Sequence, residues 1–183
     1  MARARRIASR LFIIAGNASS GKDNVISATR ELAILHASVV TKYTTRSETA
    51  EDGEEIICKY LQNGEINPKF VKKDVEKNCD ICYERNGNKY YIDSSEIWQG
   101  MKEGLFQVVS VTEAEAINQL KKRFGNGVVL IYVHSDSSTT PSELDLFVNN
   151  FDKFNHVLIY EDKYEDLYDQ LFRLFRAYEK GLL

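Results

Sequence analysis

The chain has 183 residues, of which 43% are hydrophobic and 28% are charged. These values are typical of one globular domain with a buried core. The net charge of −3 excludes the overall basic field that non-specific nucleic-acid binding requires. No stretch approaches the ~20 apolar residues of a membrane-spanning helix. We therefore expect no nucleic-acid partner, no membrane segment, and a monomer or a homodimer.

The first ten residues, MARARRIASR, are strongly basic and look like the start of a targeting peptide. The apolar run that follows, LFII, is too short for a signal sequence, so we interpret the segment as a solvated arm. Three cysteines, Cys58, Cys79 and Cys82, form no even framework of disulfides, which favours a reducing, cytoplasmic location. The C-x-x-C pair lacks a second pair of ligands, and packed thiols are favoured over a zinc site.

The first third of the chain predicts a strand, a helix and a second strand. A short apolar block at 11–15 precedes a glycine, as in a buried strand, and helical spacing of apolar residues begins near Lys22. The run ASVVTKYTTR at 37–46 is rich in β-branched residues and predicts one strand that ends near Arg46. The stretch SETAEDGEE at 47–55 then predicts a loop with five acidic residues.

The middle of the chain predicts a smaller, β-rich unit. IICKYL is compatible with a strand, and NPKFVKKDVEKN predicts a short helix that opens at Pro68. ICYER-NGN-KYYID is the clearest hairpin in the sequence, because two aromatic-rich runs flank an Asn-Gly turn.

The last half returns to alternating helices and strands. SSEIWQGMKEG predicts a helix capped by Ser94 or Ser95 and ended by Gly104. The remaining predicted elements are a strand (LFQVVSV), a helix (TEAEAINQLKKRF), a strand (GVVLIYVH), a loop and helix, a strand (NHVLIY), and an amphipathic helix (KYEDLYDQLFRLFRAYEK).

This order predicts an α/β fold with a largely parallel central sheet. We expect a single domain whose core comprises about residues 10–46 and 94–178. Residues 47–93 would form the small β-rich subdomain.

Residues 16–23, GNASSGKD, form a candidate phosphate-binding loop. The pattern G-x4-G-K follows a predicted strand and opens a predicted helix, which is the context that a P-loop requires. Small residues let backbone N–H groups surround phosphate oxygens, and Lys22 would reach the β- and γ-phosphates of ATP. The candidate nucleotide-binding residues are Gly16, Asn17, Ala18, Ser19, Ser20, Gly21, Lys22 and Asp23.

Asp23 stands where a phosphate loop normally has Ser or Thr. A carboxylate is an equally good hard-oxygen ligand for Mg²⁺, so we interpret Asp23 as the candidate metal ligand. The alternative is an ordinary acidic residue in the first turn of a helix.

Three further motifs resemble guanylate kinase-like P-loop kinases: VTKYTTR at 40–46, EDG at 51–53 and GNKYY at 87–91. The order of the elements is also similar over about residues 10–178. The resemblance implies a P-loop NTPase fold with a β-rich subdomain that binds the acceptor, and it implies transfer from ATP with Mg²⁺.

Carried over by position, the resemblance gives Arg46 the task of gripping the acceptor phosphate, and its guanidinium fork suits this. Lys22 and Arg46 are the candidate catalytic residues. The other candidate acceptor-binding residues are Thr45, Lys42, Glu84, Tyr90 and Tyr91. The alternative for the two tyrosines is cross-strand packing in the hairpin.

The chain departs from the family pattern at several positions. Thr49 replaces the second arginine, Ile56 replaces the loop tyrosine, and Lys42 replaces a serine that contacts guanine. No arginine lies between Phe124 and Phe172, where the family lid supplies several; Lys153 is the candidate substitute. We therefore expect a reduced lid and weak discrimination for guanine.

GNKYY is also similar to the reduced acceptor motif of the ribose 1,5-bisphosphate phosphokinases. The sequence thus favours a kinase that phosphorylates a small phosphorylated acceptor, either a nucleoside monophosphate such as GMP or a sugar phosphate such as ribose 1,5-bisphosphate. The alternative is a degenerate module that binds a nucleotide or a protein with little catalysis.

Overall fold

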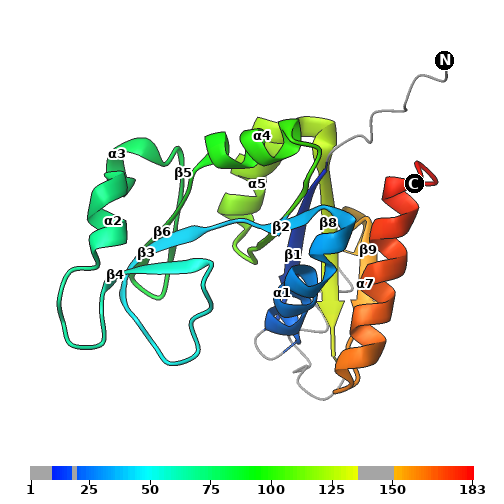
Figure 1. The fold of residues 1–183 in the computed structure, drawn as a ribbon, viewed down its shortest axis with the longest axis horizontal. Coiled ribbons are helices and arrows are strands. Elements are labelled where there is room, and N and C mark those ends of the chain that lie inside the picture. Colours follow the sequence, from blue (N-terminus) through cyan, green and yellow to red (C-terminus); the bar gives the residue numbers. More distant parts are fainter. Residues whose placement is uncertain (1–9, 18–19, 136–150) are drawn as a thin grey trace.

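The computed structural model describes residues 10–17, 20–135 and 151–183. Two sheets organise this part of the chain (Figure 1). The central sheet has the order β2-β7-β1-β8-β9, and every neighbouring pair is parallel. Its strands are β1 (Leu11–Gly16), β2 (Ala37–Val39), β7 (Phe106–Ser110), β8 (Val128–His134) and β9 (His156–Ile159).

Helices cover both faces of the central sheet, as the alternation of side chains along β1 requires. Phe12 and Ile14 pack with α1 and α7, whereas Leu11 and Ile13 pack on the face covered by α4 and α5. These helices are α1 (Lys22–Glu31), α4 (Ser94–Lys102), α5 (Ala114–Phe124) and α7 (Tyr164–Glu179). Short 3-10 turns are η1 (Leu32–Leu35), η2 (Gly125–Gly127) and η4 (Phe151–Lys153). Because both faces are buried, the interior strands β1 and β8 are almost entirely apolar.

The second sheet lies at the end of the molecule opposite α7 (Figure 1). Its order is β4-β3-β6-β5, with β3 parallel to β4 and antiparallel to β6. Its strands are β3 (Lys42–Ser47), β4 (Ile56–Tyr60), β5 (Ile81–Arg85) and β6 (Asn88–Ile92). Two short helices, α2 (Pro68–Lys73) and α3 (Val75–Asn78), cover one face through Phe70 and Val75.

The single strand predicted over residues 37–46 is two strands in two different sheets. The Val40 N–H donates to the carbonyl oxygen of Val108 in β7 (2.8 Å), whereas the Lys42 N–H donates to that of Glu55 before β4 (2.7 Å). The chain therefore crosses from one sheet to the other at residue 41. A run of β-branched residues favours extended backbone throughout, but it carries no information on which strand lies beside it.

Two other boundaries differ from the sequence prediction. The helix that opens at Pro68 is divided at Asp74, whose φ of 52° is left-handed. The cap of α4 is Asp93 rather than Ser94 or Ser95, because the Asp93 carboxylate accepts the Ser95 N–H at 2.8 Å. Aspartate and serine are both good caps, so composition alone did not distinguish them.

The predicted hairpin is confirmed: Asn86 and Gly87 connect β5 and β6 with φ values of 51° and 74°. Such positive values at both turn residues match the twist of the flanking strands. The predicted α/β fold with a parallel central sheet is likewise confirmed.

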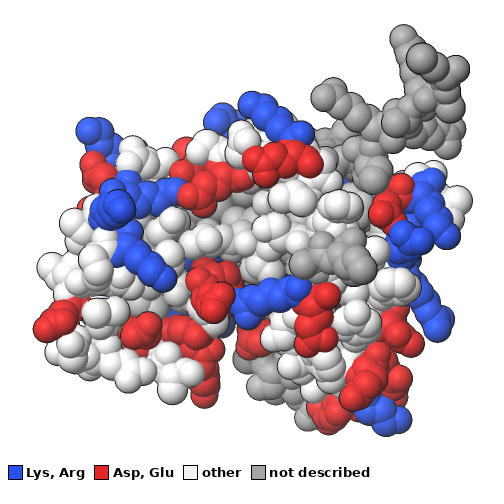
Figure 2. Space-filling model, in the orientation of Figure 1, with Lys and Arg blue, Asp and Glu red and all other residues white. Residues whose placement is uncertain are grey.

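The N-terminal arm, the helix expected after β8 and the reduced lid lie at least partly outside the described residues. Among the helices of the described ranges, none is both long and apolar enough to cross a membrane. The face shown in Figure 2 carries both acidic and basic side chains, and the acidic ones predominate along its lower edge.

Candidate functional site

The candidate phosphate loop connects β1 to α1, with little space at both of its glycines. A Cβ on Gly16 would lie 2.5 Å from Ser20 Oγ and 2.6 Å from the carbonyl oxygen of Val133. Gly21 caps α1 with φ 88°, and a Cβ there would lie 2.6 Å from the ring of Tyr160. Both positions thus accept only glycine without a shift of their neighbours. Ala18 and Ser19 lie outside the described residues.

The side chain of Lys22 bends back over this loop. Its ammonium donates to the carbonyl oxygen of Gly16 at 2.7 Å and also to that of Asn17. Ser20 Oγ lies 3.4 Å from the same ammonium. The ammonium is therefore held against the carbonyl oxygens of the first two residues of the loop.

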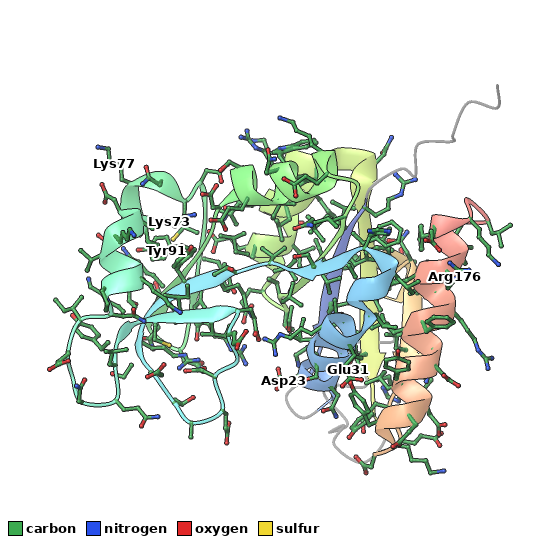
Figure 3. All side chains as sticks on the ribbon, in the orientation of Figure 1. Asp23, Glu31, Lys73, Lys77, Tyr91 and Arg176 are labelled. Carbon is green, nitrogen blue, oxygen red and sulfur yellow. The ribbon has the colours of Figure 1, made fainter. Side chains whose placement is uncertain are left out.

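Asp23 follows in the first turn of α1 and is exposed. Figure 3 shows it on the side of α1 that faces the second sheet. Within residues 10–17, 20–135 and 151–183, no cluster of three or more His, Cys, Asp or Glu side chains could hold a metal ion. One carboxylate fits Mg²⁺ only where phosphate oxygens and water supply the remaining ligands, which is how this ion usually binds beside nucleotides.

A polar cavity of about 560 Å³ lies between the start of α1 and the second sheet. Lys22 and Asp23 line it on one side, and Lys42, Arg46 and Tyr90 line it on the other. The space-filling view shows a notch between these two parts of the molecule (Figure 2). The cavity is large enough for a small-molecule ligand.

Strand alternation decides which predicted acceptor-binding residues reach this cavity. Lys42 and Arg46 lie four positions apart along β3 and both line the cavity, and Tyr90 lies opposite Thr44 in the register of β6. Tyr91 lies on the other face, in the buried cluster with Tyr43 and Phe70.

Thr45 and Glu84, like Tyr91, lie on the face of the second sheet that points away from the cavity. Thr45 Oγ1 accepts the backbone N–H of Lys89 (3.0 Å), and Glu84 is exposed opposite Lys89 in the ladder. Three predicted acceptor-binding residues, Lys42, Arg46 and Tyr90, therefore line the cavity, and the other three belong to the opposite face of the second sheet.

Arg46 is held by the carboxylate of Asp52, which lies in the loop between β3 and β4. Its Nη1 donates to Asp52 Oδ2 at 2.8 Å, its Nη2 donates to Asp52 Oδ1, and its Nε donates to the hydroxyl of Tyr90 at 3.2 Å. The Thr49 N–H (2.8 Å) and the Cys58 thiol (3.3 Å) complete the donors to Asp52 Oδ2.

These donors determine the protonation of Asp52. Burial alone would raise the pKa of its carboxyl, but the hydrogen bonds from Arg46, Thr49 and Cys58 outweigh it and lower the pKa to about 2. Burial and the same hydrogen bond raise the pKa of Cys58 to about 12. The carboxylate is thus ionised and the thiol neutral at physiological pH.

Lys42 connects the two sheets through its ammonium, which donates to the carbonyl oxygen of Ser110 at the end of β7 (2.8 Å). Burial lowers the pKa of Lys42 to about 8, against the opposing attraction of Asp23 and Glu113.

Several residues at this site were not identified from the sequence. Glu113 forms an ion pair with Arg85 at 3.4 Å, and both line the cavity. Thr112 Oγ1 donates to the carbonyl oxygen of Gly16 (3.1 Å), joining the segment after β7 to the phosphate loop. Alternation along β5 would have placed Arg85 with Tyr83, but no local pattern indicates the partner of Glu113.

Lys153, the candidate substitute for the lid arginines, lies at a second cavity of about 490 Å³. Gly16 and Asn17 line the same cavity, together with apolar residues of α5 and β8 such as Ile117 and Leu130. The two cavities therefore meet the phosphate loop from two sides.

No protein-family model matches this chain, and no curated protein sequence matches it. Among solved structures, it is similar to the guanylate kinase from Anaplasma phagocytophilum, with a TM-score of 0.65 and 12% sequence identity. The match covers 95% of this chain and 88% of that one. A similarity at this identity concerns the fold. The chain therefore has the P-loop NTPase-like fold of a guanylate kinase.

Proposed function

We propose that the protein is an ATP-dependent phosphotransferase that moves the γ-phosphate of ATP to a small phosphorylated acceptor. The observation that carries this proposal is the polar cavity, whose wall includes both Lys22 and Asp23 at the phosphate loop and Arg46 and Tyr90 on the second sheet. A donor and an acceptor bound to these two sides would face each other. Phosphoryl transfer requires this arrangement, because its catalysis is chiefly positioning and charge stabilisation.

The loop fits a phosphate chain by its position, because it joins the end of β1 to the N-terminus of α1 and carries Lys22 at the start of that helix. The loop amides and Lys22 would hold the phosphates, and Asp23 would orient one Mg²⁺. Bound Mg²⁺ supplies neutralisation of the phosphate charge. On the other side, Arg46 and Tyr90 would orient the acceptor phosphate.

Lys42 bears on the identity of the acceptor. It stands at the position of the guanine-contacting serine, and its ammonium donates to the carbonyl oxygen of Ser110. An ammonium offers donors only, so it cannot accept a hydrogen bond from the ring N–H or the amino group of guanine as a hydroxyl can. This favours a sugar phosphate, such as ribose 1,5-bisphosphate, over GMP.

A second candidate function is a nucleotide- or protein-binding module with little transfer activity. The bidentate pair of Arg46 with Asp52 favours it, because the predicted phosphate grip is already bonded to a carboxylate. The absence of arginine from the sequence between Phe124 and Phe172 favours it too, since an arginine at the transferring phosphoryl group can be worth roughly 10³-fold or more in rate.

Thermal denaturation tests nucleotide binding. Mg-ATP at saturating concentration is expected to raise the Tm of the protein by several degrees, and Lys22→Ala is expected to abolish this shift. Lys102→Ala, which changes an exposed lysine in the last turn of α4, is the matched control and should keep the shift. If no nucleotide shifts the Tm of the unmodified protein, the kinase and the nucleotide-binding module both fail.

A coupled assay of ADP release separates the kinase from the binding module. A panel of nucleoside monophosphates and sugar phosphates is incubated with Mg-ATP, and turnover of one acceptor is expected. Arg46→Ala should abolish that turnover while leaving the Tm shift by Mg-ATP in place. A Tm shift without turnover of any acceptor would reject the kinase and leave the binding module.

A further inference from the structure

The carboxylate of Asp52 is bound as a phosphate would be bound. Two guanidinium nitrogens of Arg46, the Thr49 N–H and the Cys58 thiol all point at its oxygens. Arg46 makes the bidentate contact that guanidinium groups also make with phosphate. The Asp52 side chain is only 8% exposed, so the group is inserted into this set of donors and does not lie over it.

The contact leaves Arg46 little capacity for a second anion. Its Nε donates to Tyr90, its Nη1 donates to Asp52 and to the carbonyl oxygen of Ser47 (2.9 Å), and its Nη2 donates to Asp52. A guanidinium has five N–H donors, and four of them are used by these contacts. An acceptor phosphate could not take the same bidentate position while the carboxylate remains.

We propose that Asp52 is a specificity-determining residue that occupies the acceptor-phosphate subsite, so that an acceptor phosphate binds to Arg46 and Tyr90 by displacing its carboxylate. This inference rests on the proposed function, because it names the occupant of the same subsite.

The loop that carries Asp52 can move with little loss of packing. Residues 48–51, which precede Asp52 between β3 and β4, are all exposed. Asp52 itself is held mainly by polar contacts, since the hydrophobic clusters of the second sheet are built from other residues. Removal of the carboxylate therefore exchanges one set of charge-assisted hydrogen bonds for another.

The negative charge of the ligand decides whether it can displace the Asp52 carboxylate from Arg46. A phosphate dianion offers Arg46 more negative charge and more acceptor oxygens than one carboxylate does, whereas a monoanion offers no gain over Asp52. The subsite would thus reject carboxylate and sulfonate ligands and accept a phosphate monoester, at an affinity lowered by the resident competitor.

Calorimetric titration with inorganic phosphate, in the absence of nucleotide and at constant ionic strength, tests this proposal. Asp52→Asn keeps an oxygen for the Thr49 N–H but removes the charge, and it is expected to bind phosphate about tenfold more tightly than the unmodified protein. The matched control is Glu51→Gln, which removes a neighbouring charge that also lines the cavity and should leave the affinity within about twofold. Adding Arg46→Ala to Asp52→Asn should abolish the gain.

Equal phosphate affinity in Asp52→Asn, Glu51→Gln and the unmodified protein would overturn the proposal and leave Asp52 as a structural ion-pair partner. A measurement on the unmodified protein covers the case in which Asp52→Asn folds poorly. Displacement would release Asp52 and the exposed residues 48–51 beside it, so phosphate is expected to accelerate hydrogen–deuterium exchange in the peptide that contains residues 48–52. An unchanged or slower exchange rate contradicts displacement.

The two proposals fail separately. A gain of phosphate affinity in Asp52→Asn without ADP release for any acceptor would retain the subsite and reject the kinase. ADP release by the unmodified protein, with no change of phosphate affinity in Asp52→Asn, would retain the kinase and reject the displacement.

Discussion

The geometry of the phosphate loop depends on the backbone conformation of one residue, Gly21. Its φ of 88° is left-handed, and a Cβ would lie 2.6 Å from the ring of Tyr160. Gly64 has nearly the same φ, 82°, with nothing within 4 Å of a Cβ. Gly64→Ala is therefore expected to lower the free energy of unfolding by about 1 kcal/mol, the cost of the backbone alone.

Gly21→Ala adds a clash to that cost and is expected to lose at least ~1 kcal/mol more. Urea denaturation of the two variants isolates the contact with Tyr160, because the backbone contribution is common to both. If Gly21→Ala and Gly64→Ala lose equal stability, the ring of Tyr160 does not constrain the start of α1.

The ion pair of Asp52 makes the free energy of unfolding of the protein depend on pH. The pKa of Asp52 is lowered to about 2 in the folded protein, from about 3.9 in an unfolded chain. The stabilisation is thus fully present above pH ~4 and is lost as the pH falls toward 2. We expect Asp52→Asn to be less stable than the unmodified protein by ~1–2 kcal/mol at pH 7, with the difference shrinking between pH 4 and 2.

Urea denaturation of both proteins at a series of pH values measures this difference. Glu51→Gln provides the baseline, because Glu51 is exposed and its removal should leave no such trend. A stability difference between Asp52→Asn and the unmodified protein that is constant from pH 7 to 2 would contradict the assigned ion pair with Arg46.

At the scale of elements, the start of α4 depends on Asp93. This carboxylate accepts the N–H and the hydroxyl of Ser95 and lies 2.9 Å from the ammonium of Lys73. Asp93→Ala removes the cap and leaves Lys73 with Glu96 alone among these partners, so a loss of ~1–2 kcal/mol is expected. Ser95→Ala keeps the backbone cap and should lose less than half as much in urea denaturation. The reverse order would restore Ser95 as the cap.

The elements that the sequence predicted well are those determined by local pattern. The Asn-Gly turn fixed the hairpin of β5 and β6, and the apolar block before Gly16 fixed β1 and the loop after it. The local sequence did not indicate which strands residues 37–47 pair with. β2 lies at the edge of the central sheet beside β7, and β3 belongs to the second sheet. Hydrophobic pattern describes which side chains are buried, and it does not name the neighbouring strand.

The candidate site was predictable to a similar extent. Lys22, Arg46 and Tyr90 follow from motif and position, and alternation along the strands could have separated Tyr90 from Tyr91. The partner of Arg46 could not be found in this way, because Asp52 is one of five acidic residues in the same loop. Only the folded loop distinguishes the carboxylate that enters the guanidinium fork.

At the scale of the whole molecule, the polar cavity lies where the two sheets meet, and the side chain of Lys42 connects the two sheets. Its folded pKa of about 8 lies below the ordinary value of 10.5, so the charged form is disfavoured by folding. This unfavourable contribution is complete below pH 8 and disappears as the pH rises to about 10.5. A half-buried cation that opposes stability beside Asp23, Glu113, Arg85 and Arg46 is typical of a functional site.

Lys42→Met is therefore expected to increase the free energy of unfolding at pH 7 by ~1–2 kcal/mol, less than the pKa shift alone implies, because the hydrogen bond to Ser110 is lost as well. Comparison of the two proteins by urea denaturation between pH 7 and 10.5 should show the advantage of Lys42→Met declining. The same variant should lose acceptor turnover while keeping the Tm shift by Mg-ATP, since Lys42 lies on the acceptor side of the cavity. A variant that is less stable at pH 7 would instead make Lys42 a structural link between the sheets.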